Sequence, residues 1–320
     1  MPNTNNYAEV WQKELLAINV QNALTSPFMT SNVKWLDAKT FHFTQMSTTG
    51  FRNHDLGGKF KRGVYTQQDV PFTLQHDRDI EFLVDKREVD ETNETASIQN
   101  VAKVFEKTQA TPEVDVRFFE RVYAYVHGDV SGFSAKEGLI SNVSALSDYT
   151  KSNIIAKIKA VIAKVKRYRG SLICYIKSEL MDLLELALAD KAQIQWVSIS
   201  GLEFSISTRV ANIDGVPVME VLDDDRFISK VNYLDTANGG FVKAEDGLDL
   251  TIVVASTETC KTVKKISSIY YFAPGNHTEG DGYLYQEREF WDTFVFPNGK
   301  DKKIDSVAIE HIAAAAQGQS

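Results

Sequence analysis

A long glycine-rich hairpin near the start of the chain is the feature that most constrains the fold. Residues 39–47, KTFHFTQMS, alternate apolar and polar side chains, and residues 63–85, GVYTQQDVPFTLQHDRDIEFLVD, return with a β-rich composition. The turn region between them holds Gly50, Gly57, Gly58 and Gly63. We therefore expect a long two-stranded ribbon. Because such a ribbon is only marginally stable alone in water, it should contact another part of the protein or another subunit.

The tip of this ribbon carries a local excess of positive charge, made by Arg52, Lys59, Lys61 and Arg62. One interpretation is a solvated loop. The other is a contact with acidic groups on an adjoining subunit, for which DKREVDE (85–91) and EVLDDD (220–225) are the candidates. These four residues are the candidate inter-subunit contacts.

The remaining pattern predicts an α+β fold, because helices and strands follow one another without repeated strand–helix–strand units. An amphipathic helix is expected over 7–25, and the apolar spacing predicts another over 93–109 that is closed by Pro112. Further helices are predicted at 113–126, 150–169 and 178–189, and strands at 170–176, 201–207, 215–223 and 248–256, with a β-rich end over 283–313.

The helix predicted at 150–169 has an aliphatic face beside a run of lysines. A basic amphipathic helix can lie on a membrane or bind a partner. The simpler interpretation, which we favour, is a surface helix that packs its aliphatic face on a sheet.

Composition limits the function. The formal net charge of −8 argues against a surface that grips DNA through its phosphates. The sequence begins without a basic and apolar targeting segment and has no apolar run long enough to span a membrane, so we expect a cytosolic protein without a membrane partner. Cys174 and Cys260 are the only cysteines and are expected to be buried, reduced thiols.

Motifs that carry chemistry are missing from the sequence. It contains no GxxxxGK[ST], GxGxxG, HExxH, GxSxG or CxxC, and no two of its six histidines lie three or four residues apart. The run Asp223 to Asp225 followed by Arg226 is typical of a solvated turn rather than a metal loop. We therefore predict no catalytic, cofactor-binding or metal-binding residue. An enzyme of unfamiliar motif, with Glu179, Asp182 or Asp225 as acid or base, is the alternative, which a pocket of convergent titratable groups would support.

Five segments in order carry a family resemblance: HDRDIEFLVDKREVDETN, QATPEVDVRFFERV, DGVPVMEVLDDDRF, DLTIVVASTETCKTVKKI and REFWDTFVFPNGKDKKIDSVAIEH. Over residues 35 to 312 the chain resembles the major capsid proteins of tailed bacteriophages, which have the Hong Kong 97-type fold. The resemblance implies an N-terminal arm (1–38), an extended loop (39–84), a peripheral domain with a spine helix (85–114), an axial domain (115–260), and a return to the peripheral domain with a C-terminal tail (261–320).

The resemblance also implies a function. A protein of this kind is a structural subunit that assembles as pentamers and hexamers into an icosahedral virion shell around double-stranded DNA, without sequence-specific DNA binding. Scaffolding protein and portal are the implied partners, and assembly is expected in the host cytoplasm. Some members also join subunits through a lysine in the extended loop, and Lys59 and Lys61 lie in that region. An encapsulin-like cellular shell, which has the same fold, is the alternative.

Overall fold

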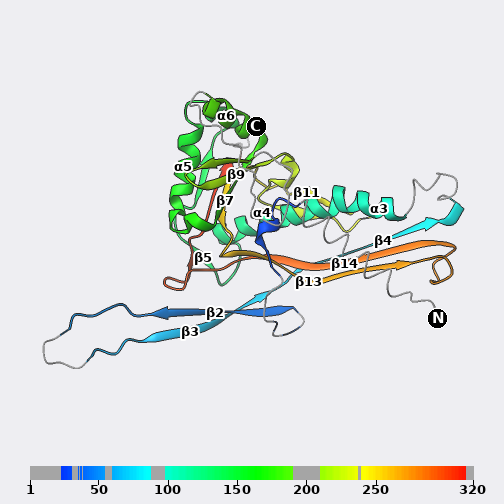
Figure 1. The fold of residues 1–320 in the computed structure, drawn as a ribbon, viewed down its shortest axis with the longest axis horizontal. Helices are drawn as coiled ribbons and strands as arrows, with labels where there is room; N and C mark the ends of the chain where they lie inside the picture. The colour runs from blue at the N-terminus through cyan, green and yellow to red at the C-terminus, as the bar shows by residue number, and fades with distance from the viewer. Residues whose placement is uncertain are drawn as a thin grey trace, which may run out of the picture.

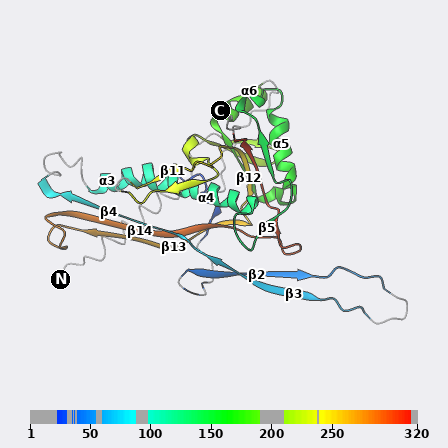
Figure 2. The same cartoon turned by 180° about the vertical axis from the view of Figure 1, so that it is seen from behind.

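The computed structural model describes residues 23–30, 35, 37, 39–54, 60–87, 98–189, 210–236 and 239–314. This part of the chain has three regions (Figure 1). A hairpin projects from one side, a long sheet with a helix along it extends to the other side, and a globular α/β region lies above their junction. The reverse view shows the same arrangement (Figure 2).

The hairpin is built from β2 (Thr40–Thr48) and β3 (Tyr65–Thr73), which pair antiparallel along their whole length. The predicted ribbon is therefore confirmed, but its second strand is shorter than expected. Residues 63–85 do not form one strand, because the chain leaves the ribbon after Thr73 and enters another sheet as β4 (His76–Asp85). The ribbon and the long sheet are thus joined through two residues, Leu74 and Gln75.

The long sheet contains β1, β13, β14 and β4 in that order among the described residues. β13 (Cys260–Phe272) and β14 (Gly282–Val295) form a long antiparallel pair, and β4 adds to β14 at one edge. β1 (Met29–Thr30) pairs parallel with β13 at the other edge. The β-rich C-terminal end predicted from the sequence is therefore confirmed.

One long helix lies along this sheet (Figure 1). It comprises α3 (Ile98–Phe105), a π-helical turn (Glu106–Ala110) and α4 (Thr111–His127). The sequence predicted two separate helices, at 93–109 and 113–126. The predicted break between them is wrong, because Pro112 does not end the helix. In the π turn the N–H of Thr111 donates to the carbonyl of Glu106, five residues earlier, and a π turn beside proline accommodates its missing N–H.

The helix ends at His127, one residue beyond the end predicted at residue 126. Gly128 adopts a left-handed conformation, with φ of 97°, and its N–H donates to the carbonyl of Ala124. Glycine accepts this conformation without a steric penalty, so it is a common helix terminator.

The globular region contains a mixed six-stranded sheet in the order β6, β16, β12, β7, β9, β8. Its strands are β6 (Ile140–Val143), β16 (Val307–Ile312), β12 (Leu250–Ser256), β7 (Leu172–Lys177), β9 (Val216–Val221) and β8 (Val210–Ile213). β12 and β7 are buried on both faces. The predicted strands at 170–176, 215–223 and 248–256 are therefore confirmed, while the predicted strand at 201–207 lies outside the described residues.

Two helices cover one face of the six-stranded sheet (Figure 1). α5 (Ile154–Lys164) packs on β12 and β16, and α6 (Ser178–Ala189) packs on β7 and β9. A 3₁₀ segment, η4 (Lys166–Ser171), follows α5. The buried residues of α5 are aliphatic, which confirms a surface helix packed on a sheet. Among the described helices none is both long and apolar enough to cross a membrane.

Short elements complete the described chain. They are η1 (Ser26–Phe28), β5 (Ser134–Ala135), η3 (Leu146–Asp148), η5 (Asp224–Arg226), β10 (Val231–Tyr233), β11 (Phe241–Lys243) and β15 (Lys303–Ile304). β10 pairs with β11, and β15 with β5. The helix predicted at 7–25 falls almost entirely outside the described residues.

Candidate assembly interface

The root of the hairpin is part of the hydrophobic core. Phe41 and Phe72 are each 2% exposed and stack on one another with ring centroids 5.5 Å apart. Phe294 of β14 packs edge-on against both rings, and Phe43 stacks on Phe296 at 4.2 Å. Burying two phenylalanines contributes several kcal/mol, so the root is fixed to the subunit.

The distal part of the hairpin is solvent-exposed. Met46 is 57% exposed, Tyr65 69% and Phe60 94%, and Phe51 is fully exposed. β2 and β3 form a two-stranded sheet with no third strand among the described residues. Trp35 bridges the outer edge of β2 at Phe41, near the root, and beyond this bridge no described strand pairs with either outer edge. Exposed apolar side chains on an unpaired ribbon are typical of a surface that binds a partner.

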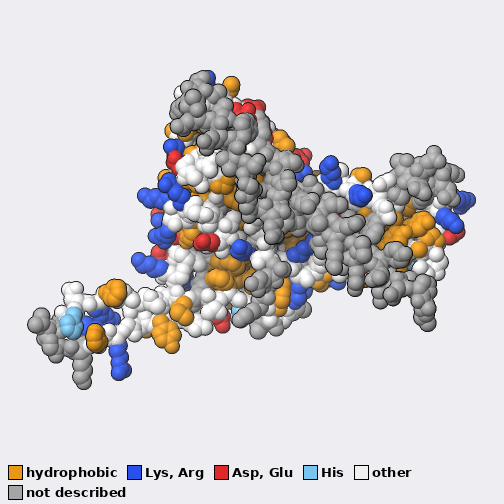
Figure 3. All heavy atoms as spheres, viewed as in Figure 1, with side chains coloured by type: hydrophobic (Ala, Val, Ile, Leu, Met, Phe, Trp, Pro, Cys, Tyr) orange, Lys and Arg blue, Asp and Glu red, His pale blue; other side chains and the backbone are white. Residues whose placement is uncertain are grey.

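The sequence-predicted basic residues lie on this distal part. Arg52, Lys61 and Arg62 are all exposed in the segments that join β2 to β3, and Lys59 lies outside the described residues. Within the described part of the chain Arg52 and Arg62 form no ion pair. Figure 3 shows blue and orange side chains together on this projection. The structure thus places three of the four candidates at one end of the ribbon.

The two acidic segments proposed as their partners differ in availability. Of DKREVDE only residues 85–87 are described, and there Asp85 accepts from the backbone N–H of Arg87. In EVLDDD, Glu220 is buried and accepts from the hydroxyl of Ser178, so it cannot meet a partner. The residues from Asp223 to Asp225 form the exposed turn η5. Of the four acidic residues in that segment, the three aspartates are therefore the ones that can contact another chain.

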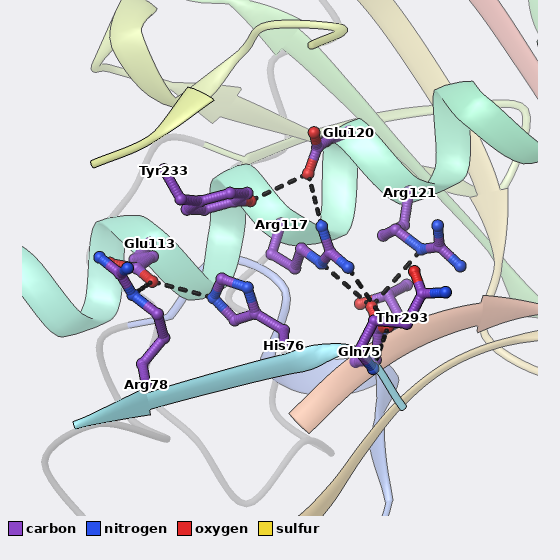
Figure 4. Close-up of polar contacts among 10 residues, drawn as sticks. Gln75, His76, Arg78, Glu113, Arg117, Glu120, Arg121, Tyr233 and Thr293 are labelled. Atoms are coloured by element: carbon purple, nitrogen blue, oxygen red, sulfur yellow. Dashed lines mark hydrogen bonds and ion pairs between the residues drawn. The ribbon is translucent and has the colours of Figure 1, made fainter. Parts of the chain in front are cut away.

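A buried polar network fixes the direction in which the hairpin leaves the subunit (Figure 4). Its centre is Asp292 of β14, which is 0% exposed. Asp292 Oδ2 accepts from the N–H of Gln75, in the two-residue link between hairpin and sheet, at 3.1 Å. Arg117 of α4 donates to Asp292 through Nε at 3.0 Å and Nη2 at 3.3 Å, and Arg121 approaches it at 3.5 Å. One carboxylate therefore ties link, helix and sheet together.

Burial alone would lower the pKa of the Arg117 guanidinium, but Asp292, Tyr233 and Glu120 together raise the pKa above its ordinary value, so Arg117 stays charged. Arg117 also donates to Glu120 at 2.9 Å, and the same carboxylate accepts from the hydroxyl of Tyr233 on β10. The bidentate contact of Arg117 with Asp292 is of a type that is strong and sets a fixed geometry.

A second part of the network lies one turn earlier on the helix (Figure 4). Glu113 of α4 contacts His76 Nε2 and Arg78 Nε of β4, each at 2.9 Å. His76 packs edge-on against Trp291 and Tyr233. The first residues of β4 are therefore bound to the helix by both charge and ring packing.

Sequence reasoning missed this network. Its signal was present as Asp292 within the apolar run FWDTFVF (290–296), and as Arg117, Glu120 and Arg121 within a predicted helix. Charged groups inside buried segments require partners, but the partner positions lie 175 residues apart and no local pattern joins them.

Three carboxylates lie buried beneath the π turn. Glu106 of the helix, Glu287 and Glu289 of β14 are each less than a tenth exposed. Lys264 of β13 pairs with Glu289, and the hydroxyl of Tyr285 donates to Glu287 at 2.7 Å. Burial, followed by the repulsion of Glu287, raises the pKa of Glu106 to about 9, and burial followed by Glu289 raises the pKa of Glu287. The protonated form of Glu106 is therefore favoured at neutral pH.

Two cavities in the described structure contain titratable groups. The first, of about 300 Å³, lies between helix and sheet and includes Arg78, Glu113, Glu287, Glu289 and Trp291 in its walls. The second, of about 350 Å³, lies at the end of α5 and includes Lys136, Lys164, Lys166, Arg167 and Asp305.

Neither cavity contains the residues proposed for an enzyme. Glu179, Asp182 and Asp225 are exposed and line neither space. The described residues include no group of three or more histidine, cysteine, aspartate or glutamate side chains arranged to hold a metal ion. Cys174 and Cys260 are free and buried, as predicted, and burial raises the pKa of both thiols.

Comparison with known proteins gives a fold. No protein-family model matches the sequence, and no curated protein matches it. Among solved structures, the mature capsid of bacteriophage PhiM1 matches with a TM-score of 0.57 and 14% identity, over 92% of this chain and 88% of that one. The capsid of cyanophage P-SCSP1u matches with a TM-score of 0.59 and 9% identity, over 92% and 89%. A structure of Microbacterium phage Oxtober96 matches with a TM-score of 0.56 and 11% identity, over 91% of both chains.

The chain therefore has the fold of these phage structures, and the Hong Kong 97-type fold predicted from the sequence is confirmed.

Proposed function

We propose that this chain is the major capsid protein of a tailed bacteriophage, which assembles as pentamers and hexamers into the icosahedral head shell around the double-stranded DNA genome. The observation that carries the proposal is the fold, which follows those of two phage capsids over 92% of the chain. Sequence identities of 9% and 14% establish the fold alone, so the function needs a second, local argument.

That argument comes from the hairpin. Its root is buried in the subunit and held by Asp292, while its distal part exposes Phe51 and Phe60 beside Arg52 and Arg62. A ribbon of this kind gains its stabilisation when a second copy covers it. Many such contacts, each modest, sum to a strong shell.

The remaining parts of the proposal concern partners and location. We propose that scaffolding protein and portal take part in assembly in the host cytoplasm, and that the product is the capsid of the virion. A net charge of −8 favours a container that does not bind its DNA tightly or by sequence. The role is structural, with no catalytic, cofactor or metal residue.

The test is assembly of the full chain, alone and with a scaffolding protein, measured by sedimentation velocity and negative-stain microscopy. Closed particles or uniform rings are expected. A chain that stays monomeric under both conditions contradicts the proposal. Packaged DNA rather than a cargo enzyme in particles from infected cells would separate a phage head from an encapsulin-like shell.

A variant of the hairpin tip tests the local argument. Thr49 and Val64 are hydrogen-bonded neighbours, since the N–H of Thr49 donates to the carbonyl of Val64 at 3.0 Å. Residues 50–63 can therefore be replaced by Asn-Gly, which closes a tight hairpin at this pair. We expect a folded subunit that no longer closes shells. Normal particles from this variant would show that the tip is not an assembly contact.

Charge is tested separately at the tip. Replacing Arg52, Lys61 and Arg62 by serine should weaken assembly, while R52K/K61R/R62K keeps the charge and serves as the matched control. Equal assembly of both variants would assign the tip contact to its apolar side chains alone.

A further inference from the structure

Charge is strongly segregated in the globular region. From residue 150 to 170 the sequence has seven basic and no acidic residues, although the whole chain has a net charge of −8. From residue 221 to 250 it has seven acidic and three basic residues. The two segments carry opposite net charge and belong to the same region of the fold.

The basic segment forms one outer flank. The basic side chains of this segment lie on α5 and η4, and Lys136 lies in a neighbouring loop. We name these side chains together the basic flank. Figure 3 shows blue side chains along this edge of the molecule. Some are neutralised within the chain, since Lys159 pairs with Asp214 at 3.0 Å and Arg167 with Asp305 at 3.0 Å.

Other members of the basic flank keep their charge available. Lys136 and Lys166 are exposed and form no ion pair with any described residue. Lys164 is half-buried, and its ammonium donates to the hydroxyl of Ser141 at 2.9 Å rather than to a carboxylate. All three line the cavity of about 350 Å³ at the end of α5. Glu137 and Asp305 also line this cavity, and Asp305 pairs with Arg167, so this end of the flank is a concave surface with a net positive charge.

The acidic segment forms the opposite flank. η5 and the β10–β11 hairpin pack on α4, where Val116 contacts Ile228 and Val231. α5 and α6 cover one face of the six-stranded sheet, whereas Phe119 of α4 packs against Tyr175 on the other side of β7. Both ribbon views place α5 and β11 on opposite sides of the region (Figures 1 and 2).

The exposed carboxylates of 223–249 are named the acidic flank. Asp223 and Asp224 are partly neutralised by Arg226 and Lys177. Asp225 and Glu245 are exposed and form no ion pair within the described chain. The two flanks face away from each other, so they cannot neutralise one another in a single subunit.

The hairpin gives the direction of the neighbouring copy. It projects on the side of α5, as both ribbon views show. A second copy that covers the hairpin therefore also faces the basic flank. Identical subunits in a ring meet through two different surfaces, one on each side of the subunit. The surface opposite α5 is the acidic flank.

We propose that in each ring of copies the basic flank of one subunit packs against the acidic flank of the next, with Lys136 and Lys166 facing Asp225 and Glu245. This inference rests on the proposed function, because it requires self-assembly. It assigns the partner of the basic surface as a second copy of this chain rather than DNA or a membrane. Charge complementarity of this kind sets register and rejects wrong partners.

Charge reversal on each flank tests the pairing. We expect K136E/K166E, and separately D225K/E245K, to raise the protein concentration needed for assembly roughly tenfold or more, because like charges would then face each other. The chain carrying all four substitutions restores opposite charges and should assemble near the wild-type concentration. None of these changes breaks an ion pair within the described chain.

The matched control for K136E/K166E is K86E/K300E, which changes the net charge by the same amount at exposed lysines outside both flanks. Far-UV circular dichroism of each unassembled variant verifies folding. Salt titration provides a second measure, since screening should weaken wild-type assembly and reduce the difference between variants.

The outcomes separate the alternatives. If neither double variant affects assembly, or if the four-substitution chain is not rescued, the pairing is wrong. Normal assembly of K136E/K166E with reduced DNA retention would assign the basic flank to nucleic acid and overturn the inference. Failure of the wild-type chain to assemble would contradict the proposed function itself. If the wild-type chain assembles and the flank variants assemble equally well, only the flank pairing is wrong.

Discussion

The root and the tip of the hairpin use similar residues for opposite purposes. Phe41 and Phe72 at the root are buried against β14, whereas Phe51 and Phe60 near the tip are exposed. The charges differ in the same way, because Asp292 beneath the root is fully paired while Arg52 at the tip is unpaired within the described chain. The difference shows that one ribbon contains a folding half and a half available to a partner.

Removing the central charge at the root should have the largest effect on the subunit. Asp292→Ala leaves Arg117 buried without its main partner and frees the N–H of Gln75. We expect a loss of about 3–5 kcal/mol in the free energy of unfolding, measured by urea denaturation of the unassembled chain. Asp79→Ala, on the exposed face of β4, is the control and should change stability by about 0.5 kcal/mol at most. A loss below about 1 kcal/mol for Asp292→Ala would contradict the role of this network.

A matched pair of phenylalanine substitutions divides the hairpin. Phe72→Ala should cost about 3 kcal/mol or more of subunit stability, because it leaves a cavity among Phe41, Phe294 and Phe296. Phe60→Ala should leave subunit stability within about 0.5 kcal/mol of wild type and should weaken assembly. Thermal unfolding and sedimentation velocity measure the two effects. If Phe60→Ala destabilises the isolated subunit as much as Phe72→Ala, the division into two halves fails.

The carboxylates under the π turn predict a pH dependence. The pKa of Glu106 is about 9 in the folded chain against an ordinary value of 4.5, so the folded state holds a proton that the unfolded state releases. Stability is therefore lost as the pH rises from about 4.5 to about 9. Glu106→Gln removes this loss and should raise the free energy of unfolding at pH 8 by on the order of 1–3 kcal/mol.

At pH 4 the Gln variant and the wild type should have nearly equal stability, because Glu106 is protonated in both states of the wild-type chain. Urea unfolding from pH 4 to 9 measures the difference. The exposed control is Glu137→Gln, which should leave the pH profile unchanged. A Gln variant that is less stable than wild type at pH 8 would show that Glu106 is charged and paired instead.

The sequence was sufficient for features that depend on local pattern. Alternation along 39–47 predicted β2, and the aliphatic spacing of 150–169 predicted α5 and its packing on a sheet. The second strand of the ribbon was predicted too long because β3 and β4 have a similar β-rich composition and pair with different strands. The partner of β4 is β14, about 200 residues away in the sequence. Pro112 was interpreted as a helix end because a π turn has no simple sequence signal.

The candidate interface divides in the same way. The basic cluster at Arg52, Lys61 and Arg62 could be found from charge within a predicted loop, and its contact with a second subunit stays a prediction. Asp292 and Arg117 could not be paired from the sequence, because burial of both groups follows from tertiary packing. Local periodicity shows which residues face one way, but only the fold shows what they face.

An exposed ion pair on the same sheet can be compared with the buried pair of Arg117 and Asp292, and has the smallest expected effect. Arg288 of β14 donates through Nε and Nη2 to both oxygens of Asp77 on β4, at 3.0 and 2.7 Å, in a geometry as good as that of Arg117 with Asp292. Both partners are more than a third exposed, so water screens the attraction. We expect Arg288→Ala to cost about 0.5 kcal/mol, and at most about 1 kcal/mol, in the unfolding experiment used for Asp292→Ala. Equally small losses for both variants would mean that burial does not strengthen the Asp292 pair, and that the root of the hairpin is held by packing.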